Sequence, residues 1–163
     1  MPYEGRSLMD ALSHSNGLDQ REQNEIERSA ARAAQIVLRP VNLDRYFNPH
    51  SDTTHPLEYA YYLLGDVRGK AVLDFGCGSG ENLIALVRRG AQVIGIDISP
   101  ELIELAKQRM QQAQTNADLR LASAYKTGLP DHSVDVIFCV ALIHHLDRGC
   151  SRRWQESCVR TAT

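Results

Sequence analysis

The sequence has little of what marks several common classes of protein. It has no excess of basic charge, with 18 Lys and Arg against 20 Asp and Glu, so nothing in it favours nucleic acid or an anionic membrane as a partner. It has no apolar run close to the roughly 20 residues that cross a bilayer. Its first residues lack the basic and apolar layout of a secretory signal. We therefore expect a soluble, cytoplasmic protein.

Cysteine is also scarce, and the four cysteines form no C-x-x-C pair. This spacing disfavours the usual zinc and redox motifs, so we predict reduced thiols and no metal site. The 163 residues are enough for one domain with a hydrophobic core and too few for two.

Short apolar runs alternate with helical patterns after Gly69. This alternation predicts an α/β fold, a parallel sheet with helices on both faces. A Ser99-Pro100 pair marks the start of one of the helices. Strands are predicted at 71–75, 91–97, 118–123 and 134–140, and helices at 81–90 and 101–114.

Two further helices are predicted before this alternation begins, at 19–38 and 57–67. The first is rich in helix formers and stops at Arg39-Pro40. Few apolar residues occur in its first two thirds, so we expect the charged residues 19–30 to form a solvated face. A polar loop with aromatic residues separates the two helices.

A glycine-rich segment, Asp74-Phe75-Gly76-Cys77-Gly78-Ser79-Gly80, stands where the first strand turns into a helix. Glycines there permit positive φ angles and let a ligand touch the main chain. The second strand ends at Asp97, and a carboxylate at that tip is placed to accept both hydroxyls of a ribose. The two features together predict a ligand that contains a nucleoside.

The spacing of the glycines distinguishes between nucleosides. A dinucleotide fingerprint is G-x-G-x-x-G, but Glu81 occupies the place of its third glycine. Asp74 and Asp97 flank the loop, and two carboxylates repel a pyrophosphate but suit a sulfonium or an ammonium group. S-adenosylmethionine is therefore the favoured cofactor. A nucleotide-dependent oxidoreductase is one alternative, and a non-catalytic fragment that binds S-adenosylmethionine or a partner is another.

Three motifs in order, "VLDFGCGSG", "VIGIDIS" and "GLPDHSVDVIFCVALIHHLD", resemble the class I S-adenosylmethionine-dependent methyltransferases of the small-molecule, type 11-like kind. The resemblance covers about residues 70–147. It implies a Rossmann-like sheet and direct transfer of a methyl group from S-adenosylmethionine to a small-molecule acceptor. By resemblance, the glycine loop lines the methionine part of the cofactor, Asp74 supports its amino group, Asp97 binds the ribose and Ile98 covers the adenine. The resemblance gives the cofactor-binding set Asp74, Gly76, Cys77, Gly78, Gly80, Asp97, Ile98, Ser123, Ala124, Tyr125 and Val140.

The sequence departs from this family after the third strand. Many relatives carry an Asp there whose carboxylate takes the adenine amino group, whereas no acid lies between Leu121 and Pro130. Ser123, Ala124 and Tyr125 are expected to serve instead, through a backbone amide, a hydroxyl or ring stacking.

Two groups of residues have open roles. His144 and His145 follow the fourth strand, and one of them is a candidate general base for the acceptor; a structural role is the alternative. Tyr46, Phe47, His50 and His55 precede the sheet. They form either a lid over the cofactor or a loop whose aromatic rings pack on the sheet edge.

The end of the chain differs from the family. Relatives continue with a helix and three further strands, so we expect the sheet to be incomplete in its C-terminal half and strand 134–140 to be an exposed edge through which the chain self-associates. The tail 148–163 lacks the periodic apolar pattern of a helix. Codons that encode it can, in a displaced reading frame, encode an amino-acid sequence that resembles the corresponding segment of the family. We interpret this tail as a frameshift product of a longer methyltransferase gene, with a genuine short variant as the competing view. The expected division is a helical or lid segment at 1–65, a partial domain that binds S-adenosylmethionine at 66–147 and the tail.

Overall fold

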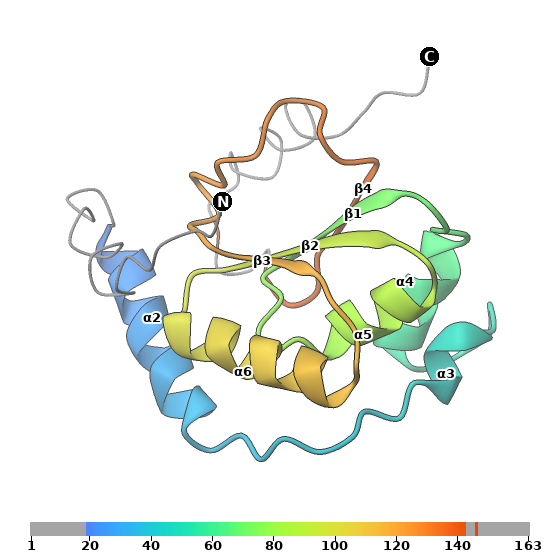
Figure 1. Ribbon diagram of the computed structural model, residues 1–163, viewed down its shortest axis with the longest axis horizontal. Coiled ribbons are helices and arrows are strands. Elements are labelled where there is room, and N and C mark those ends of the chain that lie inside the picture. Colours follow the sequence, from blue (N-terminus) through green and yellow to red (C-terminus); the bar gives the residue numbers. More distant parts are fainter. Residues whose placement is uncertain (1–18, 143–145, 147–163) are drawn as a thin grey trace.

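Strands and helices alternate from residue 71 to residue 121, as the sequence pattern predicts. The structure is a computed structural model that describes residues 19–142 and Leu146. The candidate bases His144 and His145 and the tail 148–163 lie outside the described residues. The elements are α2 (Gln20–Ala33), α3 (Asp44–Phe47), α4 (Pro56–Leu64), β1 (Ala71–Phe75), α5 (Glu81–Arg88), β2 (Gln92–Asp97), α6 (Pro100–Gln112), β3 (Asp118–Leu121) and β4 (Val136–Phe138) (Figure 1).

The four strands form one parallel sheet in the order β3-β2-β1-β4. This confirms the predicted parallel α/β sheet. Phe75 at the end of β1 pairs with Ile96 near the end of β2. The glycine loop that follows β1 therefore lies beside Asp97 at the end of β2, on the edge of the sheet where open α/β folds bind ligands. In the described part of the chain β4 pairs only with β1.

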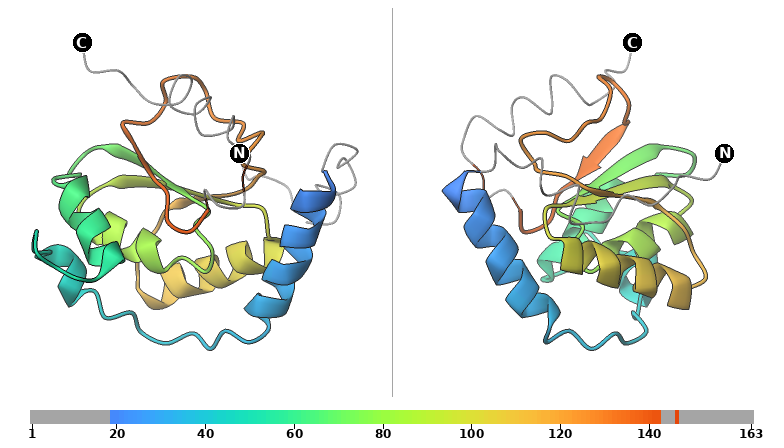
Figure 2. Two further views of the ribbon diagram at one scale, coloured as in Figure 1. Left: turned by 180° about the vertical axis from the view of Figure 1, so that it is seen from behind. Right: turned by 60° about the vertical axis from the view of Figure 1, so that its left-hand side comes forward.

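The two faces of the sheet are covered differently. Helices α4, α5 and α6 lie on one face (Figures 1 and 2). The other face carries a second core of Leu73, Phe75, Ile96 and Val134, against which side chains of the segment 122–129 pack. We expected helices on both faces, but this connection between β3 and β4 contains Gly128 and Pro130, which do not favour a helix.

The N-terminal helices are integral to the fold. Tyr61 of α4 is fully buried, and its ring lies 4.8 Å from that of Tyr46 and 5.0 Å from that of Phe138 on β4. The segment predicted as a polar loop contains the short helix α3, which brings Tyr46 to this cluster. No helix among residues 19–142 is long and apolar enough to cross a membrane.

Two of the helices begin with capping side chains, and the first of these agrees with the predicted start. Ser99 caps α6, its hydroxyl accepting a hydrogen bond from the backbone N–H of Leu102, with Pro100 at the first helical position. Asp19 and Glu22 form a reciprocal capping box at the start of α2. Helix α2 ends at Ala33, five residues earlier than Leu38, the predicted end.

Candidate functional site

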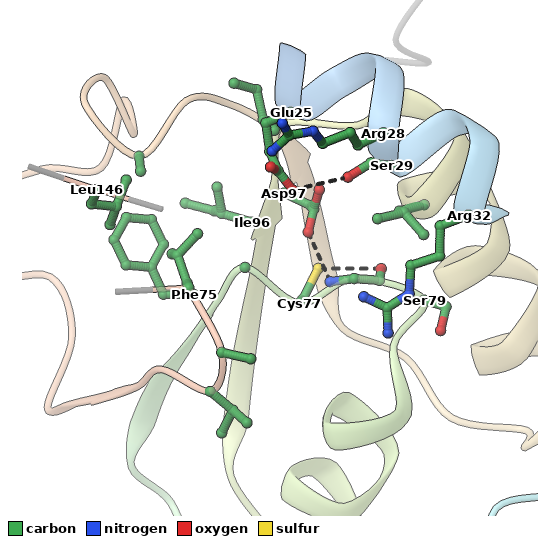
Figure 3. Close-up of a pocket in the computed structure, with 18 of the residues that line it drawn as sticks. Glu25, Arg28, Ser29, Arg32, Phe75, Cys77, Ser79, Ile96, Asp97 and Leu146 are labelled. Carbon is green, nitrogen blue, oxygen red and sulfur yellow. Dashed lines mark hydrogen bonds between the residues drawn. The ribbon is translucent and has the colours of Figure 1, made fainter. Parts of the chain in front are cut away.

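A cavity of about 910 Å³ opens at the carboxyl ends of the strands. Its size lies within the usual range for sites that bind small molecules. The loops after β1, β2, β3 and β4 line one side, and α2 lines the other (Figure 3). Of the predicted cofactor-binding residues, Gly76, Cys77, Gly78, Asp97, Ile98, Ala124, Tyr125 and Val140 line it.

The glycine loop has the backbone geometry that its sequence predicts. Gly76, Gly78 and Gly80 all have positive φ angles, of 75°, 53° and 84°. Gly80 is not on the cavity wall: it caps α5, and a Cβ there would lie 3.1 Å from the backbone of Ala106 on α6. Its place in the fold is therefore explained by close packing of α5 on α6. Gly78 is different, because a Cβ there would meet no atom within 4 Å.

Asp97 holds the loop in place from the tip of β2. One carboxylate oxygen accepts a hydrogen bond from the backbone N–H of Gly78 and the other from that of Ser99, both at 2.9 Å. Burial raises the pKa of Asp97, while the backbone N–H groups of Ser99, Gly78 and Ile98 oppose this rise. The carboxylate therefore retains capacity to accept a hydrogen bond from a ligand.

Asp74 lies near the end of β1, is 1% exposed and is absent from the cavity wall. Among the described residues, its Oδ2 atom has no hydrogen-bond partner. Burial, and then the negative charge of Asp97, raise the pKa of Asp74 from about 3.8 to about 7. A carboxyl group in this position would be stabilised in its charged form by a cation next to the loop.

The raised pKa of Asp74 predicts how stability depends on pH. Because the folded chain holds this proton more tightly than the unfolded chain, the free energy of unfolding should fall as pH rises from about 4 to about 7. Asp74→Asn removes the titration, so the stability of the variant relative to the wild type should rise over this window and then level off. Urea unfolding followed by circular dichroism at several pH values measures this difference. The same change at the exposed Asp118 is the control, and a constant difference between Asp74→Asn and wild type would contradict the assignment.

The end of β3 supplies two residues to the cavity wall, Ala124 and Tyr125. Ser123 does not line the cavity, and its hydroxyl donates a hydrogen bond to Oε1 of Glu22 on α2. The same hydroxyl accepts a hydrogen bond from the backbone N–H of Tyr125 at 3.0 Å. Ser123 thus links the end of β3 to the first turn of α2.

Helix α2 is the part of the site that the sequence analysis missed. The charged residues 19–30 were expected to face solvent, but Glu22, Glu25 and Arg28 line the cavity, with Arg32 one turn further along. Figure 3 shows Glu25, Arg28 and Ser29 beside Asp97. The reason is that α2 packs against α6, and its buried residues are only Ser29 and Ala33, too small to give a strong apolar signal.

The aromatic segment before the sheet lies apart from the cavity wall. Tyr46, Phe47, His50 and His55 are absent from the cavity wall. Tyr46 instead stacks on Tyr61, and its backbone oxygen accepts a hydrogen bond from Arg89. These contacts show that Tyr46 packs within the fold, and the lid stays a prediction.

A buried arginine joins the glycine loop to the segment that follows α2. Arg109 of α6 is 4% exposed and donates hydrogen bonds to the backbone oxygens of Ser79 at 2.9 Å and Arg39 at 3.2 Å. It also forms an ion pair with Glu81, with 3.3 Å between the nitrogen and the oxygen. A buried guanidinium needs such partners, and here they hold the loop against α6.

No group of His, Cys, Asp and Glu able to hold a metal ion occurs among the residues that the structure describes. In the same part of the chain Cys77 has a free, buried thiol. Burial raises the pKa of the Cys77 thiol, which therefore remains protonated beside the loop.

Comparisons with known proteins agree with this geometry. Residues 72–162 match the family described as "Methyltransferase domain". The ubiquinone biosynthesis O-methyltransferases of Coxiella burnetii (strain Dugway 5J108-111) and Xanthomonas oryzae pv. oryzae (strain PXO99A) are 36% and 34% identical over 80 and 98 residues. These matches cover 49% and 53% of this chain but only 34% and 39% of the relatives, so the chain spans little more than a third of their length.

A solved structure has the same fold. The geranyl diphosphate C-methyltransferase from Streptomyces coelicolor A3(2), in complex with Mg2+, geranyl diphosphate and S-adenosyl-L-homocysteine, superposes with a TM-score of 0.66 at 13% identity. The superposition covers 88% of this chain and 62% of that one. The expected Rossmann-like fold is confirmed.

Proposed function

Because the chain belongs to the family of methyltransferase domains, we propose that it binds S-adenosylmethionine and transfers the methyl group directly to a small-molecule acceptor. The single observation that carries the proposal is the pair of carboxyl groups, Asp74 and Asp97, at the tips of neighbouring strands on either side of a glycine loop. This arrangement repels a pyrophosphate and suits a cationic nucleoside.

The residues present fit that ligand. The buried Oδ2 atom of Asp74 has no partner among the described residues, and a water that links it to the amino group of the methionine part would supply one. The open side of Gly78 leaves room for that part against the main chain. Asp97 has acceptor capacity for the ribose hydroxyls, and Ile98 and Leu102 offer apolar surface for the base.

Bound S-adenosylmethionine supplies an electrophilic methyl group on a sulfonium. The chain positions the two reactants and excludes water. Methyl transfer often depends more on this positioning than on a general base. The wall formed by Phe75, Leu142 and Leu146 is apolar and suits the acceptor end of the cavity. His144 and His145 remain candidates for taking the acceptor's proton.

Titration calorimetry of the 163-residue chain with S-adenosylhomocysteine tests the proposal. We expect binding of one molecule per chain and no heat above dilution with NAD, because the second ligand carries a pyrophosphate. Preferential binding of NAD would support the oxidoreductase instead. Binding of S-adenosylhomocysteine without transfer of a labelled methyl group to any acceptor of a small-molecule panel would favour the non-catalytic fragment.

The edge position of β4 in the described sheet supports one further part of the proposal, self-association through residues 134–140. Sedimentation of the chain as a monomer at all concentrations would contradict it.

A further inference from the structure

The structure brings an acid to the end of β3, where the sequence has none nearby. Glu22 stands in the first turn of α2 and lines the cavity together with Ala122, Ala124 and Tyr125. Its carboxylate accepts a hydrogen bond from the hydroxyl of Ser123, which is 101 residues away in the sequence. A carboxylate from the N-terminal helix thus faces the same end of the cavity as the loop after β3.

Both oxygens of this carboxylate are held by the protein. Oε1 accepts from Ser123, and Oε2 accepts from the backbone N–H of Asp19 at 3.1 Å. The carboxylate of Asp19 in turn accepts from the backbone N–H of Glu22 at 2.8 Å. Because each carboxylate oxygen has two lone pairs, Glu22 keeps acceptor capacity after these bonds are made. The carboxylate of Glu22 is therefore held in one orientation and can only accept hydrogen bonds.

Glu22 lies where the adenine base of the proposed ligand is expected. If Asp97 at the tip of β2 holds the ribose and the loop after β1 holds the methionine part, the base must lie on the opposite side of Asp97, toward β3. The other acids on the cavity wall stand elsewhere: Glu25 acts electrostatically on Asp97, and Glu81 begins α5 next to the glycine loop. Glu22 is the acid on this wall that is bonded to the β3 end.

We propose that Glu22 accepts a hydrogen bond from the exocyclic amino group of adenine and makes the site selective for a 6-amino purine over a 6-oxo purine. This inference rests on the proposed function. An amino group donates to a carboxylate, whereas a carbonyl oxygen at the same position would face another acceptor. A hydrogen bond to a charged group contributes more than one between neutral groups, so the expected selectivity is large.

The test compares two ligands, S-adenosylhomocysteine and S-inosylhomocysteine, which differ only at the base. We expect the wild-type chain to bind the adenosyl compound at least about tenfold more tightly, the lower limit for one hydrogen bond to a charged group. In Glu22→Gln the amide can donate to the 6-oxo group, so the preference should drop to near parity or reverse. Calorimetry gives both dissociation constants for each chain.

The chain offers a matched control. Glu27→Gln is the same chemical change on the same helix, at an exposed residue that is not on the cavity wall, and it should retain the wild-type preference. Glu22→Gln should fold, because glutamine at this position also completes a capping box, and circular dichroism checks this. Ser123→Ala, which removes the donor that holds Oε1, should reduce the preference without abolishing it.

The outcomes separate this inference from the proposed function. A wild-type chain that binds neither compound would refute the proposed function and, with it, the role of Glu22. A Glu22→Gln variant that binds both compounds more weakly by the same factor would overturn the inference alone, since a purely structural residue cannot distinguish the two bases. If Glu22→Gln does not fold, an unchanged preference in Ser123→Ala overturns it.

Discussion

Replacing Gly78 with valine is expected to abolish binding of S-adenosylhomocysteine while the chain remains folded. Gly78 lines the cavity, and a Cβ at this position points into space where no protein atom lies within 4 Å. The valine side chain would occupy the volume proposed for the ligand. The backbone φ angle of Gly78, +53°, is also unfavourable for any residue with a side chain, at a cost of about 1–2 kcal/mol. Titration calorimetry should detect no binding at ligand concentrations that saturate the wild type.

Gly69→Val controls for the backbone strain alone. Gly69 has a similar positive φ, +72°, also has no atom within 4 Å of an added Cβ, and lies in the turn before β1, away from the cavity wall. We expect this variant to lose a similar amount of stability and to bind normally. If Gly78→Val binds as Gly69→Val does, the loop shapes the fold and does not contact the ligand.

The part of the site that could be predicted from sequence is the part that local patterns determine. The run at 71–75, the glycines after it and the run that ends at Asp97 specify two adjacent strands and a permissive loop, and the structure places them as predicted. Parallel strands joined by a helix bring their carboxyl ends to one edge, so Asp97 and the loop meet without further information.

The contribution of α2 could not be predicted in the same way. The sequence predicts that this helix begins at residue 19, but not the surface on which it packs. Its partners are distant: Glu22 reaches Ser123, and the segment after the helix is held by Arg109. Such contacts depend on tertiary packing and leave no periodic signal. Arg109 of α6 is buried in the same way, although a charged side chain is usually exposed.

Asp97→Ala is expected to weaken binding of S-adenosylhomocysteine by about 10- to 150-fold, which corresponds to a loss of about 1.5–3 kcal/mol for hydrogen bonds to a charged acceptor. Each oxygen of Asp97 already accepts one backbone N–H, from Gly78 or from Ser99, so the carboxylate is fixed before a ligand arrives. Its remaining lone pairs would accept the ribose hydroxyls without further ordering of the side chain. Calorimetry of the variant measures the loss.

Asp97 also accepts a hydrogen bond from the backbone of the glycine loop. The control is therefore a variant that loses a similar hydrogen bond between a carboxylate and the backbone elsewhere in the fold. Asp135 provides it: its carboxylate accepts a hydrogen bond from the backbone N–H of Ala71 at 2.7 Å, at the start of β1, the end of the strand away from the cavity. Asp135→Ala should lower the melting temperature by an amount similar to Asp97→Ala and leave the affinity within about twofold of wild type, since it removes no group from the cavity wall. If both variants lose the same affinity, the weaker binding of Asp97→Ala results from its lower stability and not from a lost contact with the ligand. If Asp97→Ala is folded and binds as the wild type does, Asp97 does not hold the ribose.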